Sequence, residues 1–382
     1  MMFLGITPFD IIVIIVIILL VIMLPIILKM RINSSIANYT LQIENMVKES
    51  KLKLKKISIE KGSPGNDPTD AIDNFMEFFI VPPVSLDPAG IMDKFESILD
   101  LGEEKFQHMT KTIAPNADDE WKSNITMTLK ATLGINGVAK MVRHNLELSK
   151  KTGNLQILLM LQMGLPMIMR LVKAEYEGVN AFSNENPVGD GIGPLVAGMF
   201  MEELSDDELE YFEDVVIGKK MVDGHEITIL RAKGPGARVG KIGKTVNRLI
   251  NEKGIKRLIT VDAAQKLEGE ETGSVAEGIG VVIGGFGVDK WLIEEQMVKN
   301  DLEVDAIIIK MGPEEAMCQM TRKILESSKK ALEVLNNSIS LSEPGTKIMI
   351  LGVGNSCGVP NIVKDITKIN IKEDIKKGKR GH

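Results

Sequence analysis

The chain has 382 residues, of which 44% are hydrophobic and 26% are charged, so most of it has the composition of ordinary globular protein. The net charge of −6 and the aromatic content of 4% argue against binding nucleic acid by neutralising phosphates or stacking bases. The two cysteines, Cys318 and Cys357, are too few for a disulfide framework and lack metal-ligand spacing, which favours a reducing compartment.

The first predicted element is a membrane anchor, assigned to residues 1–31. Residues 11–28 include no charged or polar side chain, and a helix of that length measures about 27 Å, close to the hydrocarbon thickness. A cleaved signal peptide would begin with basic residues, whereas here Lys29 and Arg31 follow the apolar run. The positive-inside rule therefore predicts a single span in the cell membrane, with the N-terminus outside and the remaining chain in the cytoplasm.

Residues 32–69 are predicted to form a stalk and a linker. Four side chains recur there at helical spacing: Ile36, Tyr39, Ile43 and Met46. This pattern is typical of a helix that lies on its own domain, or of a short coiled coil through which the protein could oligomerise. The basic cluster at 51–56 could contact anionic lipid headgroups or face solvent. Residues 62–70 are rich in turn formers, which indicates a linker.

A mainly helical domain is predicted for residues 70–215. Asp87 and Pro88 are typical of a helix start. The helices are expected at 70–78, from Asp87 to Lys111, and at 118–150, 154–182 and 201–214. Residues 155–172 are apolar enough to be considered as a second span. They include Arg170, which is costly inside a membrane, so a buried core helix is favoured.

An α/β domain is predicted for residues 216–370, followed by a basic tail at 371–382. Four short apolar runs are predicted as strands, at 226–230, 257–261, 305–310 and 347–353, with helices between them at 241–252 and 319–337. This order is typical of a mostly parallel sheet that is covered on both faces. Ligands of such sheets bind beyond the carboxyl ends of the strands, and each predicted strand is followed here by a glycine-bearing loop.

The loop after the first of these strands fails as a P-loop. It ends in Gly-Lys-Thr at 243–245, but Arg238 occupies the place of the required first glycine. Its glycines could still hold an anion through backbone N–H groups and basic side chains, or they could form a tight turn with a solvated basic face. The basic residues are Lys233, Arg238, Lys241 and Lys244.

The loop after the last strand fails as a dinucleotide site. Cys357 stands where the third glycine belongs, and too little chain follows for a βαβ unit. No base can be placed beside Cys357, so nucleophilic catalysis is not assigned to it. Asp190, between two glycines, either caps a helix or presents a carboxylate to a ligand. His144 lies on a predicted helix and is either structural or a general acid–base.

Residues 261–288 form the most distinctive segment. Asp262 ends an apolar strand, where a carboxylate could hold Mg²⁺ together with Glu268 and Glu270. Acidic residues in glycine-rich loops are also often only solvated. We expect a ligand site here, flanked by the neighbouring loops. Its candidate residues are Asp262, Lys266, Glu268, Gly269, Glu270, Thr272, Gly273, Ser274, Lys233, Gly234, Gly236, Asp190, Lys310, Glu314, Gly352, Gly354 and Asn355.

Several segments resemble an archaeal family of membrane-anchored proteins of unknown function, DUF1512. They lie at 78–91, 139–148, 189–198, 232–241, 260–281, 309–317 and 352–361. The resemblance implies an archaeal plasma-membrane protein with one N-terminal span, and it implies no reaction. Glu271 departs from the family pattern LEGEKTG by replacing its lysine, which argues against a role for a cation at that position.

The leading hypothesis is a membrane-anchored cytoplasmic enzyme or binding protein that takes a small anionic ligand, with Mg²⁺ as a possible cofactor. The alternative is a non-catalytic scaffold or regulator at the membrane, in which the charged loops form a contact surface.

Overall fold

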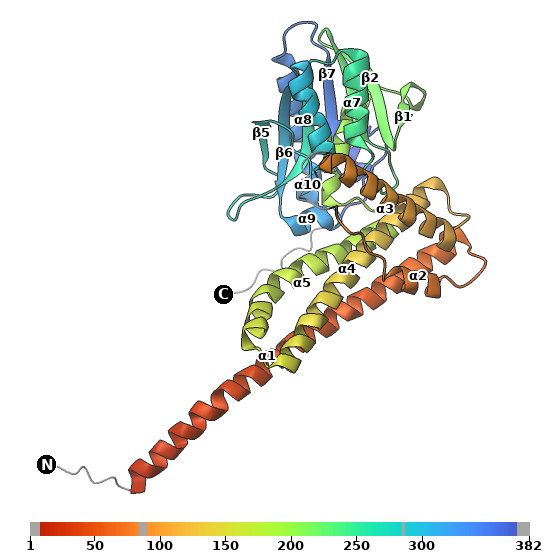
Figure 1. The fold of residues 1–382 in the computed structure, drawn as a ribbon. Coiled ribbons are helices and arrows are strands. Elements are labelled where there is room, and N and C mark those ends of the chain that lie inside the picture. The colour runs from red at the N-terminus through yellow and green to blue at the C-terminus, as the bar shows by residue number, and fades with distance from the viewer. Residues whose placement is uncertain (1–7, 84–89, 285–286, 373–382) are drawn as a thin grey trace, which may run out of the picture. The chain divides into compact units, whose positions relative to one another are not determined.

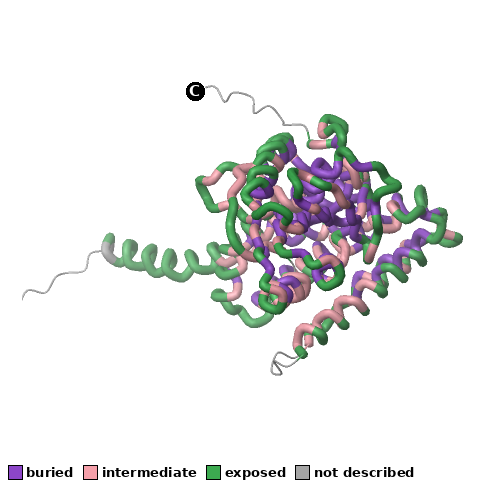
Figure 2. The backbone as a smooth tube through the Cα atoms, turned by 90° about the horizontal axis from the view of Figure 1, so that it is seen from above, coloured by how far each residue is buried: buried purple, intermediate pink, exposed green. Residues whose placement is uncertain are grey.

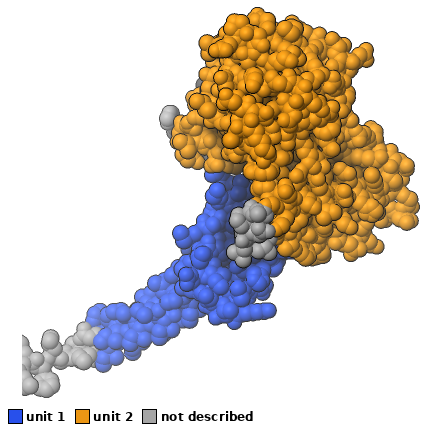
Figure 3. Space-filling view, turned by 45° about the horizontal axis from the view of Figure 1, so that its top comes forward, with its two compact units in different colours: residues 1–48, 134–172 blue, residues 49–133, 173–382 orange. Residues whose placement is uncertain are grey.

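The computed structural model describes residues 8–83, 90–284 and 287–372, and Figure 1 shows their fold. The chain forms two compact units, drawn in Figure 3: residues 1–48 with 134–172, and residues 49–133 with 173–382. The predicted order of a long apolar helix, further helices and an α/β region is confirmed.

Helix α1 (Pro8–Gly62) changes its surface character along its length. Its residues 11–28 are exposed, as Figure 2 shows, and this helix is long and apolar enough to cross a membrane. Beyond Lys29 the predicted amphipathic stripe is confirmed, since Ile36 and Ile43 are fully buried. A helix that passes from a uniformly apolar environment into a folded domain requires this change. Its side chains are apolar all round in the first part and on one face only in the second.

The first compact unit consists of the start of α1, the end of α4 (Asp119–Thr152) and the start of α5 (Leu155–Ser183). Its buried side chains include Ile36, Ile43, Ile135, Val142, Leu146, Leu158, Leu165 and Met169. The expectation of a buried core helix at 155–172 is only partly met, because Met160 and Met163 are 66% and 82% exposed. One face of this part of α5 is buried within the unit and the other is uncovered.

The helical part of the second unit packs around an aromatic cluster. It contains α2 (Thr69–Phe75) and α3 (Ile91–Ile113), whose apolar faces meet residues of α1 and α4 in one core. Phe75 stacks on Phe78 at 5.0 Å between ring centroids, and both rings meet Phe106 edge-on. The predicted helix start at Asp87 and Pro88 lies outside the described residues.

The α/β part of the second unit contains a mixed sheet. Among the described residues the spatial order is β1-β2-β3-β7-β4-β6-β5. The strands are β1 (Glu210–Phe212), β2 (Val215–Val222), β3 (His225–Ala232), β4 (Arg257–Gln265), β5 (Val275–Ile279), β6 (Glu303–Met311) and β7 (Ile348–Gly352). The four predicted strands are confirmed as β3, β4, β6 and β7, which run parallel, while β2 and β5 flank them antiparallel.

Helices cover both faces of this sheet. One face packs against α6 (Ile192–Phe200) and α10 (Arg322–Ser340), and the other against α7 (Ile242–Lys253) and α8 (Val288–Asn300). Along β7 the side chains alternate between the two cores: Ile348 and Ile350 face α6 and α10, whereas Met349 and Leu351 face α7 and α8. Burial on both faces explains why the strands are wholly apolar in sequence.

The strand order creates a crevice between β4 and β7. Strand β7 is last in sequence, yet it lies between β3 and β4. The chain leaves β4 for β5 and α8, whereas the segment after β7 packs Val359 and Val363 into the core that contains α6. The two connections therefore diverge to opposite faces, which is the switch point where α/β sheets bind ligands.

The prediction of a helix at 201–214 is wrong. The segment forms one 3-10 turn (Asp206–Glu208) and then β1. Its buried apolar residues are Met201, Leu204 and Leu209, of which Leu204 and Leu209 are five positions apart and do not share a helix face. Strands β2 and β5 were not predicted, because β2 carries Lys219 and Lys220, and β5 lies within the glycine-rich segment.

We expect Ile350→Ala to lower the free energy of unfolding by about 2–5 kcal/mol, since it leaves a cavity in the centre of the sheet. Ile350 is fully buried in β7. Chemical denaturation of the full chain in detergent measures the change. The matched control is Ile279→Ala on β5, whose side chain is 92% exposed and whose loss should change little. Equal effects at both positions would contradict this packing.

Candidate functional site

A cavity of about 360 Å³ occupies the crevice at the carboxyl ends of β4 and β7. Its walls come from the loop after β3, the end of β4, the segment after β7, and the first residues of α8. Half of the described lining consists of carboxyl groups and glycines: Asp190, Asp262, Asp289, Gly240, Gly284, Gly287 and Gly354. The other half is apolar: Leu99, Val239, Ile242, Ala263, Ile283, Val288 and Val353.

Asp262 is the most enclosed acid of the cavity. It lies in β4, opposite Ile308 of β6, and only 4% of the residue is exposed. Its Oδ1 accepts a hydrogen bond of 2.6 Å from the backbone N–H of Ala263. Burial, assisted by the negative charge of Asp190, raises the pKa of Asp262 to about 9. At neutral pH this side chain is therefore a neutral carboxylic acid in the structure described.

Asp190 approaches the same point from the segment before α6. Its Oδ2 accepts a hydrogen bond of 2.9 Å from the backbone N–H of Asn355, and burial raises the pKa of its carboxyl group. The alternative that Asp190 caps a helix is wrong, since α6 begins at Ile192 with Gly191 as its N-cap and without a side-chain cap. Gly354 permits this contact, because its φ is +129° and a Cβ there would lie 1.9 Å from the Asp190 carbonyl oxygen.

Asp289, in the first turn of α8, is a third acid of the cavity that sequence reasoning missed. Its Oδ1 accepts a hydrogen bond of 2.7 Å from the backbone N–H of Gly243 in α7. Burial raises its pKa, although this hydrogen bond opposes the shift. The available signal was an acidic residue just after Gly287, in the first turn of an unpredicted helix.

The charge of the cavity is one-sided. Three carboxyl groups reach it, and no Lys or Arg belongs to its described lining. Burial is the main cause of the raised pKa of each of the three acids, and at Asp262 the negative charge of Asp190 adds to the shift. The cavity is therefore suited to a cation, or to a group that donates hydrogen bonds.

Most of the other candidate residues on the glycine-rich segment close the β4–β5 turn (residues 266–274). Glu270 forms an ion pair with Lys310 and accepts a hydrogen bond of 2.7 Å from the N–H of Leu267. Thr272 donates to Glu315 at 2.8 Å, and the backbone of Gly273 and Ser274 pairs with that of Lys310. Glu268 and Gly269 are exposed. None of these residues lines the cavity.

The remaining candidates divide between the segment after β7 and its neighbours. Asn355 supplies the N–H to Asp190, and its side-chain Oδ1 accepts from the N–H of Cys357 at 2.9 Å. Gly352 packs against α6, where a Cβ would lie 2.4 Å from the carbonyl oxygen of Gly193. Glu314 lies in the short helix α9 (Pro313–Met317), outside the cavity lining.

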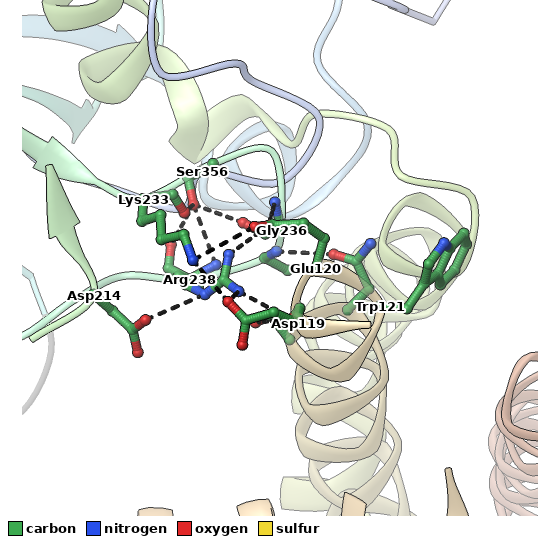
Figure 4. A network of polar contacts seen from close by, with 12 residues as sticks. Asp119, Glu120, Trp121, Asp214, Lys233, Gly236, Arg238 and Ser356 are labelled. Carbon is green, nitrogen blue, oxygen red and sulfur yellow. Dashed lines mark hydrogen bonds and ion pairs between the residues drawn. The ribbon is translucent and has the colours of Figure 1, made fainter. Parts of the chain in front are cut away.

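The loop after β3 is fastened to the start of α4, as Figure 4 shows. Arg238 is buried, and its guanidinium contacts Glu120, Asp119 at 2.8 Å and Asp214 at 3.3 Å. Lys233 pairs with Asp119 at 2.7 Å, and its hydrogen bond holds the pKa of Asp119 below the usual value. Lys233 and Arg238, which were expected to hold an anion, therefore form ion pairs within this network.

Further hydrogen bonds hold this loop in place. Gly236 donates its N–H to Glu120 at 2.6 Å, and Gly234 donates to the side chain of Asn361 at 2.8 Å. Ser356 donates to the carbonyl oxygens of Lys233 and Gly236, at 2.6 and 2.7 Å. Since Ser356 follows Asn355, the network also holds the segment that binds Asp190.

The other two lysines of the same loop are also paired. Lys241 lies 3.1 Å from Asp100, and Lys244 lies 2.8 Å from Glu96, both on α3. Each of the four basic side chains proposed to hold an anion therefore has a carboxylate partner. Among the described residues, the loop therefore has no basic face that is free of carboxylate partners.

Other candidates have ordinary surroundings. Cys357 is fully buried, and burial raises the pKa of its thiol. His144 is exposed on α4, next to Arg143, which forms an ion pair with Glu44. Within the described ranges, no three His, Cys, Asp or Glu side chains gather as a metal-ligand group.

Two family models match nearly the whole chain. The model of the DUF1512 N-terminal domain, a protein of unknown function, matches residues 10–185. The model of the DUF1512 C-terminal domain, also of unknown function, matches residues 188–360. No curated protein and no solved structure matches the chain.

The free energy of unfolding should fall as pH rises through the window in which folded Asp262 keeps its proton. The unfolded acid loses its proton near the usual pKa of 3.8, whereas the folded acid keeps it up to about 9. Between these values the native state binds more protons, so stability decreases by up to about 1.4 kcal/mol per pH unit.

Asp262→Asn, which stays neutral, should flatten this profile and gain more stability near pH 8 than near pH 5. Chemical denaturation across pH measures it. Glu268→Gln, at an exposed acid of the β4–β5 turn, is the matched control and should leave the profile unchanged. An Asp262→Asn profile parallel to that of the unmodified chain would show that Asp262 is ionised.

Arg238→Ala should lower the free energy of unfolding by about 3 kcal/mol, because it leaves the half-buried Glu120 without its guanidinium partner. Thermal or chemical unfolding of the full chain measures this. Lys219→Ala is the control: it breaks an exposed pair with Glu210, which contributes less than about 1 kcal/mol. Comparable losses in the two variants would contradict a buried network around Arg238.

Proposed function

The chain belongs to the DUF1512 family, and on that premise we propose that it is a membrane-anchored binding protein for a small anionic ligand. The ligand is held through a divalent cation, such as Mg²⁺, between Asp190 and Asp262. The observation that carries this proposal is the pair of enclosed carboxyl groups that face a cavity without any basic partner in its described lining.

A divalent cation resolves the electrostatic conflict in this cavity. Without one, burial raises the pKa of both Asp190 and Asp262, the charge of Asp190 adds to the shift at Asp262, and Asp262 retains its proton at neutral pH. A cation favours the ionised carboxylates and displaces that proton. Mg²⁺ fits this role because it takes oxygen ligands and is usually held by one or two carboxylates together with waters and ligand phosphates. A third protein ligand is not required.

The other walls of the cavity favour an anion beside the cation. Helix α8 begins at Val288, with Gly287 as its N-cap and without a side-chain cap, and its first residues line the cavity. The N–H groups of a helix start attract negative charge. Gly240, Gly284 and Gly354 add backbone that a ligand can approach closely. The volume of about 360 Å³ is near the lower limit for small-molecule sites, which favours a small phosphate- or carboxylate-bearing ligand.

The N-terminal part of α1 provides the anchor. Its exposed apolar residues 11–28 are long enough to span the hydrocarbon layer, and Lys29 and Arg31 follow directly. The basic residues after the span favour an orientation with both compact units on the cytoplasmic side.

Isothermal titration of the full chain in detergent with MgCl₂ tests the proposal. We expect binding that releases on the order of one proton per ion, seen as a dependence of the heat on the buffer, and an affinity that rises up to about tenfold from pH 7 to pH 8. Asp262→Asn should abolish this binding. Inorganic phosphate should raise the melting temperature further in the presence of Mg²⁺, and not after EDTA treatment.

Glu268→Gln is the matched control, since it removes an acid of the same segment that does not reach the cavity. It should leave Mg²⁺ binding unchanged. Absence of Mg²⁺ binding at pH 8, or loss of binding in Glu268→Gln with retention in Asp262→Asn, would refute the site. Mg²⁺ binding without any effect of phosphate would support the cation site and contradict the binding of phosphate beside it.

A further inference from the structure

Helix α5 has an exposed apolar face within the first compact unit. Leu155, Leu159 and Met160 are 45%, 43% and 66% exposed, and Met163 and Met167 continue the same face at 82% and 65%. The opposite face is covered, since Leu158, Leu165 and Met169 are buried. Exposed apolar side chains scattered singly are normal, but five of them gathered on one helix face mark an interaction surface.

The start of this face lies beside the end of the apolar segment of α1. The Nζ of Lys29 donates a hydrogen bond of 3.3 Å to the carbonyl oxygen of Gly153, in the turn between α4 and α5. Lys29 is the first charged residue after the apolar residues 11–28. The α4–α5 tip (residues 150–160) is therefore level with the position where α1 leaves the hydrocarbon layer.

The charges around this tip match the same boundary. Arg31 and Lys151 are exposed, and Lys29 is partly exposed at the contact with Gly153. Lys150 is also exposed, and it pairs with Glu147 at 2.9 Å. Exposed basic residues immediately beyond a span attract anionic lipid headgroups. Apolar side chains next to basic ones are the composition of a segment that lies in the interfacial layer.

We propose that the α4–α5 tip is a second membrane contact, with Leu155, Leu159 and Met160 inserted among the lipid headgroups beside α1. This inference rests on the proposed anchoring by α1. The covering partner is the lipid surface, because the face is continuous with the exposed apolar surface of the anchor through the Lys29–Gly153 contact.

The contact lies on the surface of the bilayer and does not cross it. Helix α5 passes the test of length and composition for a span. However, one face is occupied by the protein core, and Gln156, Gln162 and Arg170 interrupt the other. The basic cluster at 51–56 is a poorer candidate for headgroup contact. Lys51 and Lys55 pair with Asp73 and Asp67, and Lys51 lies about 33 Å of helix beyond Lys29.

An environment-sensitive fluorophore on single cysteines tests this inference in the full-length protein. The background is Cys318→Ser, since Cys357 is fully buried. The labelled variants are Met160→Cys at the tip, Met23→Cys in the anchor and Leu41→Cys on α1. Leu41 is 54% exposed and apolar, and it lies about 18 Å of helix beyond Lys29, so it is the matched control.

In vesicles of phosphatidylcholine and phosphatidylglycerol, the labels at positions 160 and 23 should emit at shorter wavelength and be quenched severalfold more by brominated lipid than the label at position 41. Quenching at 23 without quenching at 160 would overturn the second contact and leave the anchor intact. A short-wavelength emission at 160 without lipid quenching would show protein there, such as a second copy. Absence of quenching at 23 would refute the anchor, and the inference with it.

Discussion

The close approach of α6 to the ends of β4 and β7 is the constraint on which the site depends. A Cβ at Gly193 would lie 2.2 Å from the carbonyl oxygen of Val353 and 2.4 Å from that of Val261, so only glycine allows this contact. It places the segment before α6 directly over the two strand ends. Asp190 thereby meets Asp262, which is far from it in sequence but adjacent at the switch point of the sheet.

This arrangement is electrostatically unfavourable within the α/β region. Two enclosed acids without a basic partner disfavour ionisation, and a fold that needed only stability would replace them with neutral groups. The surrounding basic side chains are already engaged elsewhere, as the pairs of Arg238, Lys241 and Lys244 show. The cost is therefore localised at the cavity, as is typical of functional sites.

The two proposals concern different compact units of the chain. The cation site belongs to the second compact unit, and both membrane contacts belong to the first. Each unit carries its own evidence: enclosed carboxyl groups around a cavity in one, and exposed apolar side chains next to basic residues in the other.

The sequence by itself determined the apolar first helix, the helices α4, α5, α7 and α10, and the four parallel strands, because these depend on local periodicity and on burial along a single element. It did not predict α6 and α8. The short edge strands β1 and β5, the lysine-bearing strand β2, and the turn within 201–214 depend on neighbouring segments and were not predicted. It also identified Asp262 and Asp190 separately, from their positions next to a strand end and between glycines.

Only the tertiary structure decided that these two acids meet, that Glu268 and Glu270 do not join them, and that the basic loop is neutralised by α3 and α4. The physical reason is that strand order is not encoded locally: β7 enters the sheet between β3 and β4 although it comes last in the chain. Contacts across such long sequence separations depend on the packing of the whole domain, and no single sequence motif predicts them.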